Sequence, residues 1–168
     1  PETAHALEER LNAIIDEEIR EKERQEAYRR EEELIGNLQA WWLQRMLASS
    51  PRPGAIPPLE EKLTLFWHSH FASGFQDKIR HTYPLWRQNE TFRELATKSF
   101  PQQLKALIHD PAMLVWLDNA SSHRGNPNEN FARELMELFS LGVGHYSETD
   151  VKEAARALTG YSVDREHW

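Results

Sequence analysis

The stretch "NPNENFARELMELFSLG", residues 126–142, sets polar side chains beside a phenylalanine–leucine stripe. Apolar residues that recur three or four positions apart predict an amphipathic helix. Asn126 before Pro127, with Glu129 three residues after the asparagine, indicates where the helix begins. Gly142 is placed to end it, because glycine adopts the left-handed conformation that closes many helices. The stretch therefore predicts a helix that buries one side.

Three polar residues of this helix, Asn130, Glu134 and Glu137, form a stripe next to its apolar face. Glu134 lies at the border, where burial would raise the pKa of its carboxyl unless a cation or hydrogen-bond donors offset it. Arg133 is on the same helix but farther round. We expect a buried network of ion pairs and amides that holds helices in register. A ligand site and a metal site are the alternatives.

The N-terminal part of the chain is highly charged. Residues 3–48 are predicted to form one long helix, or two, and residues 16–33 hold nine acidic and five basic side chains. The apolar stripe nearly vanishes in that charged segment. Such a segment is typical of a solvated helix or a mobile connection, and a coiled-coil arm for a partner is the alternative.

Helix breakers divide the rest of the chain. Prolines and a glycine end the first helical region within residues 49–58, and no segment has the two-residue period of a strand. The further predicted helices span residues 59–71, 99–110, 111–117 and 127–141, and a last helix begins near Ser147 and ends at Gly160. Residues 81–96 are predicted to be a loop that runs into a helix. We therefore predict an all-α fold, an irregular multi-helix bundle with a long charged N-terminal helix. Residues 1–36 would form a helical arm and residues 37–168 the helical core domain.

Capping residues mark three of the helix starts. Ser99 can cap the helix that follows it, and Asp110 precedes Pro111, which is favoured at the first helical position. Ser147 and Asp150 form a capping-box pattern, in which each side chain bonds the backbone of the other residue. These patterns predict the helix starts to within a residue or two.

Two histidines lie in the strongly apolar helix 59–71. His70 falls on the apolar arc, whereas His68 points elsewhere, so the two imidazoles are not placed to share a metal ion. A lone histidine on an apolar face is typically a hydrogen-bonded core residue, and a ligand or proton carrier is the alternative. The predicted buried arc consists of Leu59, Leu63, Phe66, Trp67 and His70.

Amide and acid side chains gather at loop ends. Asp118 and Asn119 begin a polar loop and Asn128 lies at its end, where such side chains usually bond the backbone of turns and caps. The loop also opens onto the free N–H groups of a helix start, where anions can bind.

A second amide–acid pair consists of Asn89 and Glu90. If this pair met Asn130 and Glu134 across the core, two carboxylates could share a proton or a cation. The candidate ligand-binding residues are therefore Asn89, Asp118, Asn119, Asn128, Asn130 and Arg133.

Composition excludes several kinds of site. The 168-residue chain has no cysteine, which excludes disulfides, thiolate metal sites and thiol nucleophiles. It has no His-Glu-x-x-His pattern and no glycine-rich phosphate loop, so the sequence identifies neither a metal ligand nor a cofactor. The net charge is −7 without a basic patch, and we expect no nucleic-acid partner. No apolar run approaches the roughly 20 residues of a membrane span.

Four segments resemble a bacterial family. They are "EKLTLFWHSHFA", "WRQNETFRELA", "DPAMLVWLDNA" and "GNPNENFARELMELFSLGVGHYSETDVKEAARALTGYSVD", in this order, between Trp41 and Asp164. These consecutive uncommon words are similar to the family called domain of unknown function 1800. The resemblance implies that the chain is an excerpt of a longer, exported protein, with a periplasmic or extracytoplasmic location. It also implies that a further C-terminal part packs on the core, but it implies no reaction.

Two functions fit these observations. The first is a non-catalytic helical module with a buried Asn/Glu/His network, which acts in assembly or surface interaction and whose acidic N-terminal helix is open to a protein partner. The second is a hydrolytic or metal-assisted enzyme, with His70, Glu90 and Glu134 handling protons in an interhelical pocket. A ligand-binding domain that uses Asn128 is a third. We prefer the module, because each catalytic interpretation has a simpler structural one beside it.

Overall fold

Helices build the described part of the chain. The computed structural model describes Leu7, Arg10 and residues 17–50, 52–54, 57–75 and 78–164. The helices are α2 (Glu17–Ala48), α3 (Pro58–His70), α4 (Thr82–Glu94), α5 (Phe100–Leu107), α6 (Pro111–Trp116), the 3-10 turn η1 (Asn119–Ser121), α7 (Glu129–Glu137) and α8 (Glu148–Ala157). No β-strand occurs in the described residues, so the predicted all-α, multi-helix class is confirmed.

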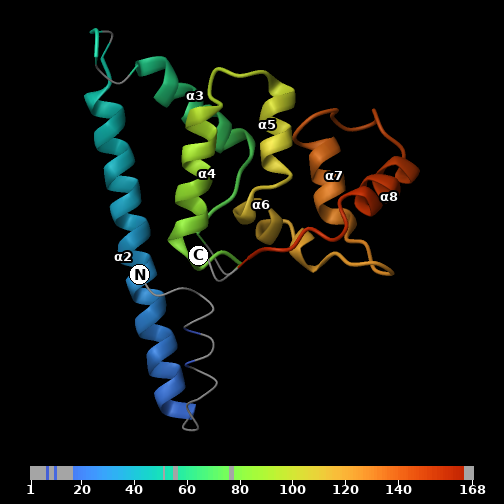
Figure 1. The fold of residues 1–168 in the computed structure, drawn as a ribbon, viewed down its shortest axis with the longest axis horizontal. Coiled ribbons are helices and arrows are strands. Elements are labelled where there is room, and N and C mark those ends of the chain that lie inside the picture. The colour runs from blue at the N-terminus through green and yellow to red at the C-terminus, as the bar shows by residue number, and fades with distance from the viewer. Residues whose placement is uncertain are drawn as a thin grey trace.

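The helices follow one another across the molecule, from α2 on one side to α7 and α8 on the other (Figure 1). α3 and α4 pack on α2 and on each other, α6 packs on α4, and α8 packs on α7. The N-terminal half of α2 extends beyond the other helices (Figure 1). After α8 the chain runs back, and residues 162–164 lie beside α4 and the start of α6.

α2 is one continuous helix of 32 residues that passes through Gly36. The predicted boundary between 1–36 and 37–168 therefore falls inside a single helix, and the division into arm and core stays a prediction. The first part of the predicted 3–48 helix lies outside the described residues, apart from Leu7 and Arg10. None of the described helices has the length and apolar character to cross a membrane.

The charged half of α2 packs more closely than its composition predicts. Tyr28 stacks on Phe75, with 5.7 Å between the ring centroids. Glu31 accepts a hydrogen bond from the Thr82 N–H at 2.8 Å, and Ile35 packs on the smaller apolar cluster of the core. One side of this segment is therefore anchored, and the segment is not the freely solvated helix that its sequence suggests.

Two apolar clusters form the core. The larger joins α3 to α8, and its fully buried members include Phe71, Phe131 and Val151. The smaller lies between α2, α4 and α6 around Ile79 and Leu85. The core thus runs along the row of helices instead of gathering at one centre.

α3 buries only part of the predicted arc, because Trp67 packs on the core while Leu59 and Phe66 do not. Leu59 and Phe66 of the predicted buried arc are 60% and 54% exposed, whereas Glu61 and Thr64 are buried. The reason is that Glu61 accepts hydrogen bonds from arginines of α2 and α4. That ionic contact decides the rotation of α3, and part of its apolar arc faces outward.

Local capping places the later helices. Asp110 caps α6 by accepting the Met113 N–H at 2.8 Å, and Ser147 and Asp150 form the predicted capping box of α8. The Gln102 side chain accepts the Ser99 N–H at 3.1 Å, so Ser99 occupies the N-cap of α5. All three predicted starts are confirmed.

α7 is shorter than the predicted helix over 127–141. Asn128, and not Asn126, caps it, because the Asn128 Oδ1 accepts the Asn130 N–H at 2.9 Å. At the other end Gly142 has a φ of +82° and its N–H bonds the Met136 carbonyl at 3.0 Å. The predicted glycine stop is confirmed, but the last turn before it is no longer α-helical.

We expect Phe131→Ala to lower the free energy of unfolding by about 3–5 kcal/mol, because it removes a fully buried ring and leaves a cavity. Urea unfolding followed by circular dichroism measures this. Phe66→Ala is the matched control and should change stability by about 1 kcal/mol or less, since Phe66 is 54% exposed. Equal losses in the two variants would contradict the described core.

Candidate functional site

A buried carboxylate lies at the junction of α2, α3 and α4. Glu61 of α3 is 1% exposed. Its Oε1 accepts from the Nε of Arg45 and, at 2.9 Å, from the Nε of Arg93, while its Oε2 accepts from Trp42 Nε1 at 2.9 Å. Burial raises the pKa of Glu61, but the hydrogen bonds and charges of Arg93 and Arg45 outweigh burial, so its pKa lies below the ordinary value. Both oxygens are occupied, so this carboxylate is suited to holding helices together.

Arg93 extends this cluster along α4. Its Nη2 donates to the Asn89 Oδ1 at 2.7 Å, and its Nη1 donates to Glu90 Oε1. The guanidinium also lies over the ring of Trp41, 5.2 Å from the centroid. We call Trp42, Arg45, Glu61, Asn89, Glu90 and Arg93 the Glu61 cluster. The predicted amide–acid pair on α4 therefore belongs to it and does not meet Asn130 or Glu134.

The three predicted catalytic residues have separate surroundings. His70 Nε2 lies 3.2 Å from the Phe139 carbonyl oxygen, and Glu90 pairs with Arg93. Glu134 is half-buried on α7. No hydrogen bond or ion pair within the described part of the chain joins His70, Glu90 and Glu134, so the structure does not bring them into one proton-handling group.

His70 lies among aromatic rings, of which Phe66 and Phe100 are partly exposed and Phe139 is buried. Its imidazole is 6.0 Å from the Phe66 ring, 6.2 Å from Phe100 and 6.3 Å from Phe139, measured between centroids. Leu138 lies one position before Phe139 in the chain and Leu141 two positions after it, and they are 61% and 52% exposed. We call Phe66, His70 and Phe100 the His70 face, together with Leu138 and Leu141, whose chain segment meets His70 through the Phe139 carbonyl. His70 is half-buried, with the core ring of Phe71 4.7 Å away on its inner side, so it lies where an apolar surface meets the core.

His68 points into the protein between α2 and α4. Its ring lies 5.2 Å from the Trp42 ring and 5.4 Å from the Phe92 ring. Burial lowers the pKa of His68, and the nearby Arg93 charge lowers it further. His68 is therefore neutral near pH 7 and acts as a packing residue. Within the described residues, no group of three His, Asp or Glu side chains is placed to hold a metal ion.

The predicted ligand-binding residues of the 118–128 loop mostly bond backbone. Asn119 Nδ2 donates to the Leu158 carbonyl at 3.0 Å, and Asn128 Nδ2 donates to the Asp118 carbonyl at 3.0 Å. Asp118 itself has a φ of +61° and accepts from Lys78 Nζ at 2.6 Å. These contacts fix the shape of the loop, which is the simpler of the two predicted roles.

The two predicted residues on α7 also act within the fold. Asn130 Nδ2 donates to the Leu117 carbonyl at 3.2 Å, although its side chain is exposed. Arg133 makes two hydrogen bonds of 2.8 Å to Glu148 and so joins α7 to α8. The polar stripe of α7 therefore bonds neighbouring segments at the surface, while the buried ionic cluster lies on α3 and α4.

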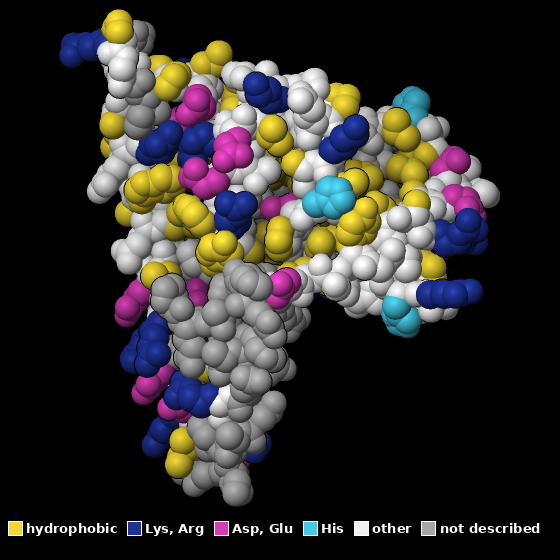
Figure 2. Space-filling view, in the orientation of Figure 1, with side chains coloured by type: hydrophobic (Ala, Val, Ile, Leu, Met, Phe, Trp, Pro, Cys, Tyr) yellow, Lys and Arg dark blue, Asp and Glu magenta, His cyan; other side chains and the backbone are white. Residues whose placement is uncertain are grey.

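A cavity of about 480 Å³ lies between α4, the α5–α6 junction and residues 162–164. Its wall combines apolar side chains with charged and hydroxyl-bearing ones. The lining residues include Tyr83, Pro84, Arg87, His109, Asp110, Leu114, Ser162, Val163 and Asp164. On the face shown in Figure 2, hydrophobic side chains gather over α2 and α4 with basic side chains among them. The size lies within the range of small-molecule sites.

Asp110 is the buried acid of this cavity wall, at 5% exposure. Its Oδ1 accepts from Gln88 Nε2 and from the Met113 N–H, both at 2.8 Å, and Gln88 in turn accepts from the Ser73 hydroxyl at 2.6 Å. Burial raises the pKa of Asp110 to about 6, against the opposing effect of these donors. The sequence identified Asp110 only as a cap, because the cavity is made by segments far apart in the chain.

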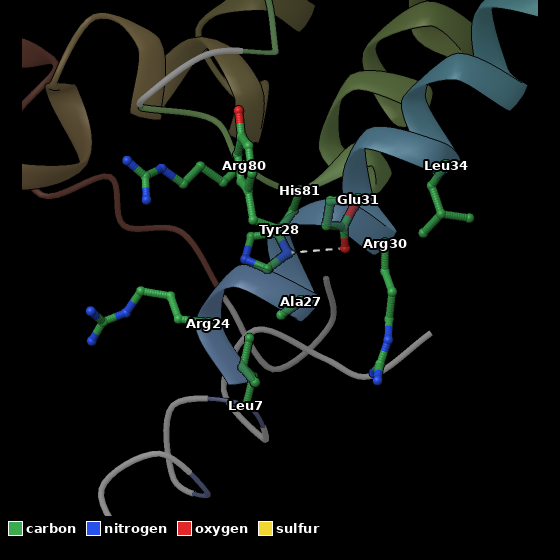
Figure 3. A pocket seen from close by; sticks show the side chains of 9 residues that line it. All are labelled: Leu7, Arg24, Ala27, Tyr28, Arg30, Glu31, Leu34, Arg80 and His81. Atoms are coloured by element: carbon green, nitrogen blue, oxygen red, sulfur yellow. Dashed lines mark hydrogen bonds and ion pairs between the residues drawn. The ribbon is translucent and has the colours of Figure 1, made fainter. Parts of the chain in front are cut away.

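A second hollow of about 230 Å³ lies beside the charged half of α2. Figure 3 shows the His81 imidazole pointing at the Glu31 carboxylate, with Arg24 and Arg30 extending away from that pair. Burial raises the pKa of Glu31, but hydrogen bonds from His81 and Thr82 lower it by more. The acid of this hollow is therefore occupied by its structural partners.

Comparison with known proteins identifies a family but no activity. The family model described as "Protein of unknown function (DUF1800)" matches residues 1–168, which includes the charged segment that the four resembling words leave out. No curated protein and no solved structure matches the chain.

Glu61→Gln should lower the free energy of unfolding by about 3 kcal/mol, because it leaves two guanidinium groups without their shared counter-charge. Glu60→Gln is the adjacent control and should change stability by less than about 1 kcal/mol, since Glu60 makes a single contact of 3.5 Å to Arg45. Chemical unfolding measures both. If the two variants were equally stable, Glu61 would not hold the helices.

Asp110→Asn should remove a pH dependence of stability. The pKa of Asp110 is about 6 in the folded chain against an ordinary value of 3.8, so the folded state binds the proton more tightly than the unfolded state. This contribution to stability is greatest below the unfolded pKa and is lost as the pH rises toward 6. The advantage of the Asn variant over the wild type should therefore grow across this window and then level off. Thermal melts at a series of pH values check it, and a constant difference would refute the assignment.

Proposed function

We propose that this chain, which belongs to the DUF1800 family of proteins of unknown function, is a helical assembly module of an exported bacterial protein. In this proposal the His70 face binds another polypeptide, and the Glu61 cluster is the buried polar network that holds the face-bearing helices in place. The extracytoplasmic, periplasmic location is part of the proposal and is what the family resemblance implies.

The observation that carries the proposal is the exposure of the His70 face. Phe66 is 54% exposed, Leu138 is 61% exposed and Leu141 is 52% exposed. Soluble proteins rarely leave large apolar side chains grouped at the surface unless the group is an interaction site, and aromatic residues are enriched where interfaces are strongest. An apolar polypeptide segment is therefore the partner that this face fits.

The Glu61 cluster supports the same function by fixing the geometry of the surface. It joins α2, α3 and α4 through a carboxylate bound by Arg45 and Arg93. A surface whose helices are already locked loses less conformational entropy when it binds. The cluster thus favours a preformed docking surface over one that must rearrange.

The enzymatic alternative has weaker support. This alternative needs His70, Glu90 and Glu134 to handle protons. Glu90 forms an ion pair with Arg93, and the Nε2 of His70 lies at hydrogen-bond distance from the Phe139 carbonyl oxygen. A general base needs to lie within hydrogen-bond reach of the proton it takes, together with a cavity for substrate. Neither of the cavities described above is lined by His70, Glu90 or Glu134. We therefore place assembly first.

Site-specific photo-crosslinking in the bacterium that carries the gene tests the proposal. A photoreactive phenylalanine analogue at position 66 of the full-length protein should give a discrete crosslinked product with a second polypeptide, identified by mass spectrometry. The same analogue at Leu47, which is 77% exposed but lies on α2 outside the His70 face, should not give this product.

Two further results would decide the proposal. In the first, the photoreactive analogue is placed at position 138 instead. The additional substitution Phe66→Ser should then reduce the yield of the crosslinked product. A crosslink from position 66 only to another segment of the same polypeptide would overturn intermolecular assembly, as would the absence of any crosslink.

A further inference from the structure

The cavity between α4, α6 and residues 162–164 contains an arginine, Arg87, whose charge acts on the Asp110 carboxyl through space and lowers its pKa, against the larger effect of burial. Its guanidinium lies within ion-pair distance of no carboxylate in the described part of the chain, so the interaction with Asp110 is a longer-range one. The guanidinium lies 6.0 Å from the centroid of the Trp86 ring, which holds it at the cavity rim by a cation–π contact. The planar guanidinium remains available as a two-pronged donor.

The carboxylates of the same cavity are already engaged. Asp110 accepts hydrogen bonds from Gln88 and from the Met113 N–H, and Asp164 has an interaction of its own. Because the carboxylates already have partners, the wall can best bind an anion, through the Arg87 guanidinium. Arginine meets carboxylate and phosphate groups with two parallel hydrogen bonds, which gives such a site geometric selectivity.

The rest of the wall suits an organic group attached to that anion. Pro84, Leu114 and Val163 contribute apolar surface, and Ser162 contributes a hydroxyl. Tyr83, which is 43% exposed, contributes an aromatic ring to the wall. A pocket of this kind typically buries an apolar body and orients it with a few polar groups.

We propose that this cavity binds a small organic anion, whose carboxylate or phosphate group meets Arg87 and whose apolar body packs on Pro84, Leu114 and Val163. This site is separate from the His70 face, and neither proposal depends on the other.

Binding at this site is linked to protonation. The charged or titratable groups on the cavity wall are Arg87 and Tyr83 from α4, His109 and Asp110 from the α5–α6 junction, and Asp164 from the returning chain. The pKa of Asp110 is about 6, so its carboxyl is neutral in mildly acidic solution and repels an anion less there. An anion should therefore bind more tightly as the pH falls through 6, with uptake of a proton.

Calorimetric titration of the whole chain with benzoate and with phenyl phosphate tests the site, and benzamide is the neutral control. At least one anion should bind and benzamide should not. Preference for benzoate would identify a carboxylate ligand, and preference for phenyl phosphate would identify a phosphate ester. Titration in two buffers of different ionisation enthalpy should reveal proton uptake that Asp110→Asn abolishes.

Arg87→Gln should weaken binding of the preferred anion by at least about tenfold, the effect of losing a bidentate charged contact. Arg124→Gln is the matched control, because Arg124 is an exposed arginine of the 118–128 loop outside the cavity, and it should leave binding unchanged. Circular dichroism of both variants checks that they are folded. Binding of benzamide equal to that of the anions, no binding of either anion, or equal binding by the two variants would overturn the proposal.

Discussion

The carboxylate of Glu61, bound by arginines from two other helices, is the interaction on which the rest of the structure depends. It is 1% exposed, and leaving such a charge unpaired in the interior would be strongly unfavourable. In the observed rotation of α3, the Glu61 carboxylate accepts hydrogen bonds from Arg45 of α2 and Arg93 of α4. That rotation carries Phe71 into the core and leaves Leu59 and Phe66 outside.

The exposed aromatic surface is a consequence of the same constraint. A helix that is apolar nearly all round can bury only part of its circumference when a charged residue must face its neighbours. In α3 the side left over contains Phe66, and His70 lies between it and the end of α7. The energetic requirement of the ion cluster thus creates an apolar surface that a binding partner can cover.

The cavity beside α4 arises from a different arrangement, in which a cap residue also forms a cavity wall. Asp110 begins α6 by accepting the Met113 N–H, and Gln88 and Ser73 extend its hydrogen bonds into the interior. The chain after α8 then returns and closes the far side with residues 162–164. Burial among these segments raises the carboxyl pKa of Asp110 to about 6, and the nearby Arg87 charge opposes part of that rise.

The sequence by itself determined the helices and several of their ends, because caps such as Asp110 with Pro111 and Ser147 with Asp150 act over three or four residues. It also indicated that Asn89 and Glu90 form a polar pair, but it did not identify Arg93 as the residue that bonds both of them. The tertiary structure alone decided that Glu61 is buried, that His70 and Glu134 stay apart, and that a cavity forms at Arg87. The contacts of Glu61 join residues 16 and 32 positions apart, and the cavity joins α4 to residues 162–164, so their free energy is set by how helices pack and not by any local pattern.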